Sequence, residues 1–418
     1  MTDGLNKIQQ DILPVLMAGL LPALAMIVPK STVIVLLVVG LNGIVLAYRR
    51  GALRDVFPPL LTAIFIAALG WMLFKSVATF DGNPTIRLWF RLLPLVLCGF
   101  AALWLFRTLA SRTRQRVHNA LVVGTVFGLV LYATAYTATL MGNRDFLGPG
   151  HPDPLVHFSS GQMIVAMLSS AVLGTLCARR RFLWAAVFSA SALVLFIPSS
   201  SVIAVVALMA AVAGFLAGKF LPVPFRNAIA GFVVAGVLAI PVGLSSLPAD
   251  FAESRELKTA VQSAKFAPGL DHSITHRLQI WLFVTQRAKE FPYGGWGLDV
   301  SRSLPGGKIL TSVGESRLPL HPHNGVLQVW LEIGVPGVVL LAILVGISAT
   351  SRRRSRTDNA VMAVRLGTLL SMLVVGGLAF GIWQNWWFSS LWLVAAIVAT
   401  FQTEDGSTSE QIDSDVPS

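Results

Sequence analysis

Long apolar runs separated by short polar segments dominate the chain. An α-helix needs about 20 apolar residues to cross a bilayer, and about twelve runs reach roughly that length. The pattern predicts an all-α polytopic membrane protein, with the turn at Pro198–Ser201 dividing the seventh run from the eighth. The expected spans are residues 12–28, 32–48, 56–75, 92–110, 117–140, 158–178, 182–197, 201–218, 228–247, 325–349, 361–382 and 386–402.

One long connection interrupts this pattern and sets the domain organisation. We expect spans one to nine in residues 1–247, a large loop over 248–323, spans ten to twelve in 324–402, and a disordered tail over 403–418. The tail is acidic and rich in serine, a composition that cannot bury enough apolar surface to fold.

The large loop contains a predicted helix of its own. In the stretch ITHRLQIWLFVTQRAKEFPYGGWG, the apolar residues Ile274, Leu278, Trp281 and Phe283 recur at near-helical spacing before a Pro-Tyr-Gly-Gly turn. This pattern is typical of an amphipathic helix that lies on or just above the bilayer. The helix would carry Arg277 and Arg287.

Composition agrees with the membrane assignment and excludes a soluble protein. Of the 418 residues, 55% are hydrophobic and only 12% are charged, against about 25% charged in a typical soluble domain. The net charge of +12 comes mostly from residues between apolar runs, so orientation in the membrane explains it better than nucleic acid does. Cys98 and Cys177 lie within apolar runs and are expected to pack there without a disulfide. The first run reads as a retained span.

Basic residues also predict which face of the membrane each connection occupies. Clusters at 48–54, 112–116, 179–181 and 351–356 fall on one side, and the positive-inside rule places that side in the cytoplasm with both termini. The other face then holds the large loop and a smaller one over 141–157. It also receives six of the seven histidines, namely His151, His157, His272, His276, His321 and His323.

The stretch LPLHPHNGVLQVWLEIGVPG, from Leu318 to Gly337, combines these histidines with an apolar run. Because Pro322 disfavours helix at the residue before it, the tenth span should begin near His323, with His323 and Asn324 in its first turn. Asn324, Gln328 and Glu332 recur every four residues and would form a polar stripe. An acid such as Glu332 in a membrane helix must face a partner or a cavity.

A helix N-terminus at His323 predicts acid–base chemistry. Its free N–H groups and partial positive charge favour anions and disfavour imidazolium, so the histidine tends to stay neutral and able to accept a proton. Arg277 could reach the same place, and a guanidinium is a natural clamp for a diphosphate.

Simpler interpretations stay open at this stage. His323 and Asn324 could only cap the helix, Glu332 could only lock helix packing, and Arg277 could bind a lipid headgroup. Histidine pairs could hold zinc, although no cysteine or acid cluster joins them. Three tryptophans are most simply an interfacial aromatic belt, and they are Trp383, Trp386 and Trp387.

The motifs of this region resemble a known family. The pattern His323-Asn324-x-x-Leu327-Gln328-x-x-x-Glu332-x-Gly334, followed by Gly337, is similar to the signature of the O-antigen ligase and polymerase superfamily. Arg277-x-x-x-Trp281 and Pro292-x-Gly294-x-Trp296-Gly297 in the preceding loop are similar to it as well. The span plan, with one large outer loop before the motif, looks like the WaaL-type ligases of Gram-negative inner membranes.

The resemblance implies a reaction and a site. Such ligases are glycosyltransferases with a GT-C-like membrane fold that move a finished polysaccharide from undecaprenyl diphosphate to a sugar hydroxyl of the lipid A core. The reaction belongs to lipopolysaccharide biosynthesis and occurs on the periplasmic side, without nucleotide or metal. His323 matches the family histidine proposed as the base, and Arg277 matches an arginine that holds the diphosphate. The partners implied are undecaprenyl-diphosphate-linked O antigen, lipid A-core oligosaccharide and membrane lipids.

The chain departs from the family pattern at one place. Many members carry a Ser-Arg pair where this chain reads Pro198-Ser199-Ser200-Ser201-Val202, without arginine. Lys30, Lys75, Arg87, Arg91 or Arg144 would have to supply the second cation, and Arg144 is favoured because its outer loop opens onto a span. The remaining predicted substrate contacts are Asn324, Gln328, Arg287 and His321, with Glu332 supporting them from behind.

Three other functions remain as alternatives. An O-antigen polymerase performs the same chemistry on a second lipid-linked glycan, and a protein O-oligosaccharyltransferase is the next relative. An acid within a membrane helix, such as Glu332, would also fit a secondary transporter. Such a transporter would be expected to show inverted repeats, and no repeat between the halves is visible.

Overall fold

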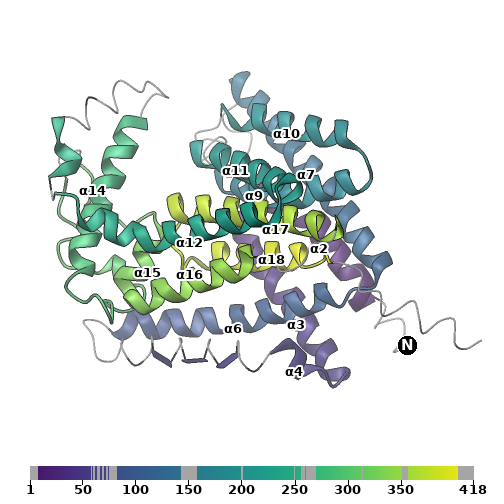
Figure 1. Cartoon of the computed structure of the whole chain (residues 1–418), viewed down its shortest axis with the longest axis horizontal. Helices are drawn as coiled ribbons and strands as arrows, with labels where there is room; N and C mark the ends of the chain where they lie inside the picture. The colour runs from purple at the N-terminus through teal and green to yellow at the C-terminus, as the bar shows by residue number, and fades with distance from the viewer. Residues whose placement is uncertain are drawn as a thin grey trace, which may run out of the picture.

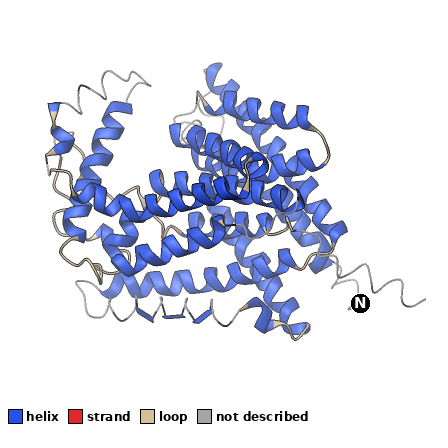
Figure 2. Cartoon of the chain, in the orientation of Figure 1, coloured by secondary structure: helices blue, strands red, loops and turns tan. Residues whose placement is uncertain are grey.

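The computed structural model describes residues 8–57, 82–142, 158–198, 201–248, 250–255, 270–311, 314–350 and 356–402, together with isolated residues between 59 and 74 and residue 259. Within these segments the regular secondary structure is helical (Figure 2), and one isolated β-bridge joins Leu310 to Ser316. The all-α class predicted from the apolar runs is therefore confirmed for the described residues.

The helices follow the predicted runs closely in most places. Their bounds are η1 (Ile8–Ile12), α2 (Leu13–Ile27), η2 (Pro29–Ser31), α3 (Thr32–Arg49), α4 (Leu53–Val56), α6 (Gly82–Arg107), α7 (Ser111–Leu140), α9 (Ser159–Ala178), α10 (Phe182–Phe196), α11 (Val202–Phe220), α12 (Val223–Ser245), η3 (Phe251–Glu253), α14 (Leu270–Ala288), η4 (Val300–Arg302), α15 (Gly325–Ile333), α16 (Val335–Ala349), α17 (Arg356–Leu378) and α18 (Asn385–Val398).

Eight helical stretches in the described part of the chain are long and apolar enough to cross a membrane. They are Gln10–Ile27, Pro29–Arg49, Ile86–Arg107, Ser111–Leu140, Ser159–Ala178, Val202–Phe220, Val223–Ser245 and Asn359–Leu378. Three apolar helices are shorter, namely α10, α16 and α18. Most of the predicted third span, residues 56–75, lies outside the described residues. A multi-pass membrane protein follows from these helices.

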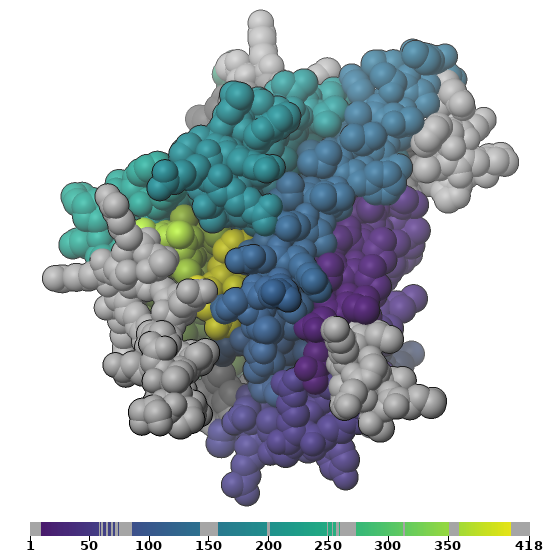
Figure 3. Space-filling model, turned by 90° about the vertical axis from the view of Figure 1, so that its right-hand side faces the viewer, coloured from purple at the N-terminus to yellow at the C-terminus, as the bar shows by residue number. Residues whose placement is uncertain are grey.

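Two hydrophobic cores organise the helices. The larger core includes residues of α2, α3, α6, α7, α9, α11, α17 and α18. In Figure 1, α17 and α18 run through the middle of the molecule, and Figure 3 shows the yellow C-terminal residues only as a small patch among the blue and teal helices. The smaller core joins α12, α14, α15 and α16 with the start of α6.

The predicted tenth span is two helices instead of one. Gly334 separates α15 from α16 with a φ of +88°, a left-handed conformation that glycine adopts without strain. A Cβ at this position would lie 2.6 Å from the carbonyl carbon of Tyr293, so the chain break is also a point of close packing. The expectation of a single continuous helix over 325–349 is wrong because of this glycine.

The predicted loop helix is present as α14. Ile280, Phe283 and Val284 on α14 are buried in the smaller core, whereas Ile274 near its start is 37% exposed. The Pro-Tyr-Gly-Gly turn follows the helix as predicted. α14 therefore packs against α12 and α15 and brings one face of the large loop onto the membrane helices.

Candidate active site

His323 lies just before α15, not in its first turn. Its φ is +54°, in the left-handed region that residues with a Cβ rarely adopt. Its Nδ1 lies 2.7 Å from the carbonyl oxygen of Ala379, in the loop between α17 and α18. A carbonyl can only accept a hydrogen bond, so Nδ1 carries the hydrogen, and the neutral ring keeps its lone pair on Nε2. The prediction that His323 is helical is wrong, because Asn324 occupies the N-cap.

Asn324 has the capping role that the simpler interpretation gave it. It is the N-cap of α15, and its Oδ1 accepts a hydrogen bond from the backbone N–H of Leu327 at 3.1 Å. The residue is 5% exposed. Its side chain therefore satisfies one of the unpaired N–H groups at the helix start, and α15 begins directly after it.

Glu332 is the centre of a buried hydrogen-bond network. The residue is 2% exposed, and its carboxylate accepts four hydrogen bonds. The donors are the backbone N–H of Asp299 at 2.8 Å, Ser301 Oγ at 2.5 Å, Gln328 Nε2 at 3.1 Å and Trp383 Nε1 at 2.6 Å. A buried acid needs such partners, so Glu332 ties the segment around η4 and the segment before α18 to α15.

Gln328 extends this network to the α17–α18 loop. Its Oε1 accepts the backbone N–H of Ile382 at 2.9 Å, while its Nε2 donates to Glu332. The polar stripe predicted for Asn324, Gln328 and Glu332 is thus present on α15, with each member bonded to protein.

The glycine and tryptophan motif after α14 docks on the end of α15. The backbone N–H groups of Trp296 and Gly297 donate to the carbonyls of Leu331 and Glu332 at 2.8 and 3.1 Å. These bonds satisfy carbonyls that a helix C-terminus leaves unpaired. Gly295 permits the approach, since a Cβ there would lie 2.3 Å from the carbonyl carbon of Glu332.

Arg277 projects from α14 toward the same loop as His323. Its Nη1 donates to the carbonyl of Leu378, the residue next to the one that holds His323. Burial lowers the pKa of Arg277. Nearby, Trp281 Nε1 donates to the carbonyl of Pro322 at 2.9 Å, which fixes α14 against the histidine segment. The structure therefore brings the predicted base and the predicted diphosphate clamp together.

The surroundings of His323 favour its neutral form. Burial is the largest effect and lowers the pKa of His323, the hydrogen bond to Ala379 raises it, and electrostatic interactions with Arg277 and His276 lower it again. A histidine in this environment is available as a proton acceptor at neutral pH.

His321 packs beside His323 and is more deeply buried. The two ring centroids lie 4.2 Å apart, and His321 is 6% exposed. Its Nδ1 accepts the backbone N–H of His323 at 3.3 Å, and its Nε2 lies 3.0 Å from Nε2 of Gln384. Burial, with smaller contributions from His323, Arg302 and Arg277, lowers the pKa of His321 to about 3. His321 is neutral at pH 7.

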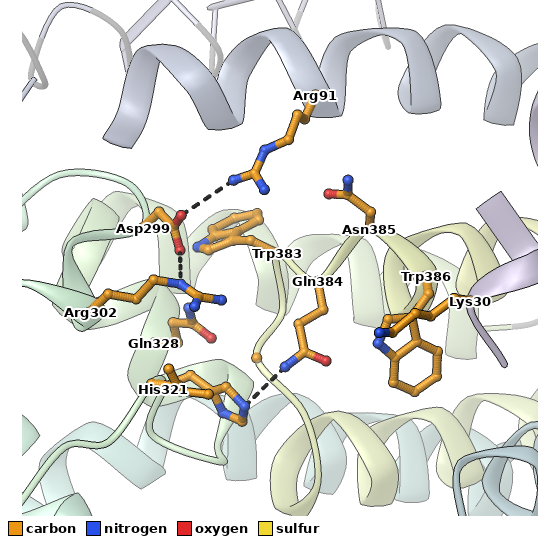
Figure 4. Close-up of a pocket in the computed structure, with 12 residues that line it drawn as sticks. Lys30, Arg91, Asp299, Arg302, His321, Gln328, Trp383, Gln384, Asn385 and Trp386 are labelled. Atoms are coloured by element: carbon orange, nitrogen blue, oxygen red, sulfur yellow. Dashed lines mark hydrogen bonds and ion pairs between the residues drawn. The ribbon is translucent and has the colours of Figure 1, made fainter. Parts of the chain in front are cut away.

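A pocket of about 490 Å³ opens on the other side of His321. Figure 4 shows Arg91 reaching toward it from α6, with the carboxylate of Asp299 between Arg91 and Arg302. The ion pairs measure 3.4 Å from Arg91 and 3.3 Å from Arg302. Further lining comes from Lys30, Gln328, Trp383, Gln384, Asn385 and Trp386.

The predicted substrate-binding residues do not all meet at this pocket. His321 and Gln328 line it, whereas Arg287 lies apart from it and donates to Glu290 at 2.8 Å and to the carbonyl of Pro305 at 2.9 Å. Arg144, the favoured second cation, lies outside the described residues, as do Lys75, His151 and His157. Of the other candidates for the second cation, Lys30 and Arg91 line the pocket.

Several pocket residues were missed by sequence reasoning. Arg302 and Asp299 form a charged pair three residues apart, and their position in the large loop, directly after the Trp296-Gly297 motif, was the available signal. Trp387 is 1% exposed and packs inside the protein, so the predicted interfacial belt is wrong for this residue. Trp383 is hydrogen-bonded to Glu332.

Two further candidates have ordinary structural places. Ser201, where the family arginine is absent, is the N-cap of α11, and its Oγ accepts from the N–H of Ala204 at 3.3 Å. Cys98 is a buried free cysteine, as its apolar surroundings predicted. In the described part of the chain, no group of three or more His, Cys, Asp or Glu side chains is arranged to hold a metal.

Comparison with known proteins supports the resemblance seen in the motifs. Residues 199–342 match the family described as O-antigen ligase. A Rickettsia conorii protein provisionally named polysaccharide ligase is 32% identical over 187 residues, 43% of this chain and 42% of that protein. Provisionally named polysaccharide ligases of Rickettsia felis and Rickettsia bellii are 26% and 24% identical over 299 and 288 residues, covering 67% and 68% of this chain and 67% of each relative.

The matched family region contains α11, α12, α14, α15 and the start of α16, so it includes both Arg277 and His323. The chain aligns with less than half of the length of the Rickettsia conorii protein. Together these matches confirm the resemblance to an O-antigen ligase-type family that the motifs predicted.

Proposed function

We propose that this chain, whose central region resembles the O-antigen ligase family, transfers a finished polysaccharide from undecaprenyl diphosphate to a sugar hydroxyl of the lipid A core. The family match over residues 199–342 and the provisional names of the Rickettsia relatives support a ligase or polymerase type of function. The choice of donor and acceptor lipids is our inference from that resemblance.

The hydrogen bond between His323 Nδ1 and the carbonyl of Ala379 is the observation that carries the proposal. At 2.7 Å it fixes the tautomer and the orientation of the ring and leaves Nε2 as the acceptor. We assign His323 as the general base that receives the proton of the acceptor hydroxyl. A positioned base contributes roughly 100- to 10,000-fold to a rate.

Arg277 is assigned to the diphosphate leaving group. The acceptor oxygen forms a bond to the anomeric carbon as the bond from that carbon to the diphosphate oxygen breaks, and the electron pair leaves with the diphosphate. A half-buried guanidinium beside His323 can stabilise that charge where water is partly excluded. Attack opposite the diphosphate inverts the anomeric centre. No step requires a nucleotide or a metal.

The orientation in the membrane follows from the same proposal. The positive-inside rule, applied to the basic clusters, supports termini in the cytoplasm of a bacterium with an inner membrane. The segment with His323 and Arg277 would then face the periplasm, where lipid-linked glycan and lipid A core meet. Alignment of two such substrates can supply about 7–11 kcal/mol of the barrier.

A reconstitution tests the proposed function by its product. Purified protein in vesicles would receive undecaprenyl-diphosphate glycan and rough lipopolysaccharide, with EDTA and no nucleotide. A ladder of glycan on the lipid A core is the expected product. Longer lipid-linked glycan would make the protein a polymerase. Glycosylated protein would make it an O-oligosaccharyltransferase, and no transfer from competent substrates would favour transport.

A further inference from the structure

The pocket beside His321 has more positive than negative charge. Lys30, Arg91 and Arg302 line it, and Asp299 is the carboxylate among its described lining residues. Asp299 is shared between the two arginines, whose side chains are each 51% exposed. In the described part of the chain no carboxylate pairs with Lys30. A pocket with this balance favours a ligand with a negative charge.

Asn385 indicates that the ligand also has a hydrogen-bond donor. Its Oδ1 is buried and has no hydrogen-bond partner among the described residues. The residue lines the pocket (Figure 4). An amide oxygen only accepts hydrogen bonds, and a buried acceptor without a donor is costly. An ionised phosphate or diphosphate oxygen cannot supply that hydrogen, whereas a sugar hydroxyl group can.

Two aromatic side chains complete the lining. Trp383 is held by its bond from Nε1 to Glu332, and the backbone carbonyl of Trp386 accepts from Thr32 Oγ1 at 2.8 Å. Figure 4 shows Trp383 near Asp299 and Trp386 beside Lys30. Indole rings present apolar surfaces with a polar edge, and the C–H faces of a sugar ring pack on such surfaces.

We propose that this pocket binds an acidic sugar, a pyranose that bears a carboxylate or a phosphate, within one of the two saccharide substrates. The acidic group pairs with Arg302, Arg91 and Lys30, a hydroxyl donates to Asn385 Oδ1, and the ring packs against an indole. The cavity of about 490 Å³ is large enough for a sugar residue. The assignment of this sugar to a transferase substrate rests on the proposed function, whereas the sugar's chemistry rests on the pocket itself.

Saturation-transfer NMR on the full-length protein in detergent tests this assignment directly. The probes are D-galacturonate against D-galactose and D-glucose 6-phosphate against D-glucose. We expect saturation of the two acidic sugars and at least fivefold less of the two neutral ones. Arg302→Gln and Arg91→Gln should each reduce the acidic-sugar signal at least threefold. Arg317→Gln, which removes the same charge from an exposed site on the large loop, should leave it unchanged.

Asn385→Leu tests the hydroxyl contact. It should weaken both acidic sugars while leaving the binding of inorganic pyrophosphate unchanged. Equal saturation of acidic and neutral sugars, or acidic-sugar binding that survives all three pocket variants, would overturn the proposal. Pyrophosphate binding that depends on Arg302 and Arg91, without any sugar binding, would instead identify a diphosphate site.

Displacement distinguishes the two sources of the sugar. Release of bound galacturonate by the acceptor lipid would place the acidic sugar in the acceptor, and release by the lipid-linked donor would place it in the glycan. Failure of both lipids to compete would overturn the link to transfer. Product formation in the reconstitution without acidic-sugar binding would leave the proposed function intact and remove this inference. Sugar binding without transfer would do the opposite.

Discussion

The indole Nε1 of Trp383 donates to Oε2 of Glu332 at 2.6 Å, which joins the segment before α18 to the end of α15. Trp383 also lines the pocket beside His321. The bond therefore connects the walls of the candidate site to a carboxylate that was predicted only to support the substrate contacts. Replacing either Glu332 or Trp383 should therefore change the stability of the protein.

Replacing Glu332 should destabilise the fold because its carboxylate accepts four buried hydrogen bonds. Glu332→Gln keeps the shape but turns one acceptor oxygen into a donor that faces other donors. We expect a loss of about 1–3 kcal/mol in the free energy of unfolding. Trp383→Phe, which removes one donor, should cost less. Unfolding in detergent measures both, with Trp184→Phe as the control because Trp184 is 61% exposed. A wild-type unfolding curve for Glu332→Gln would contradict the network.

The break between α15 and α16 should depend on Gly334. Gly334→Ala places a Cβ 2.6 Å from the backbone of Tyr293 at a φ of +88°, so we expect a loss of at least about 1–3 kcal/mol. Gly377→Ala is the matched control, because it lies within α17 with open space around its Cβ position. It should be neutral or slightly stabilising. Equal stability of the two variants would show that the break does not need glycine.

His321 should make the protein sensitive to acid. Its folded pKa of about 3 lies below the value of 6.5 for an unperturbed histidine. Between these values the unfolded chain binds the extra proton, so stability is fully present above pH 6.5 and falls as the pH drops toward 3. The limiting slope is about 1.4 kcal/mol per pH unit. His321→Gln should lack this contribution. Parallel stability curves for wild type and variant between pH 6.5 and 5 would argue against a buried neutral His321.

The pH dependence of transfer should report the link between Arg277 and His323. A base must be neutral, so activity falls when His323 is protonated, and its lowered pKa puts this acid limb below pH 6.5. Arg277→Gln removes a positive neighbour and should move the limb to higher pH while it reduces the rate. Arg277→Lys keeps the charge but loses the planar fork, so the limb should stay in place with a lower rate. An acid limb at the same pH in wild type, Arg277→Gln and Arg277→Lys would show that Arg277 does not affect the pKa of His323.

Much of the fold could be predicted because helices that cross a membrane need long apolar runs, which are visible in the sequence. Runs of apolar residues located most helices, and the spacing of apolar residues located α14. The break at Gly334 was missed, although Pro336 two residues later is a residue type that marks the start of a new helix. The left-handed backbone of His323 depends on the capping by Asn324 and on the carbonyl of Ala379, a residue 56 positions away.

The candidate site was predictable only where its residues lie in local sequence motifs. Local sequence motifs were enough to identify His323, Arg277 and the polar stripe that includes Glu332. The pocket combines Lys30, Arg91, Arg302 and Trp383 from four separate segments, and no local pattern relates those positions. Trp383 looked like part of an interfacial belt because its hydrogen-bond partner, Glu332, is distant in sequence.

The most direct test of the central assignment is the initial rate of glycan transfer by reconstituted wild type and by His323→Ala, at equal amounts of folded protein. His276→Ala is the control, because it removes a neighbouring histidine on α14 whose Nε2 lies 3.1 Å from the carbonyl of Ser316. We expect a loss of about 100-fold or more for His323→Ala, with His276→Ala close to wild type. A His323→Ala rate equal to wild type would contradict the assignment of His323 as the base.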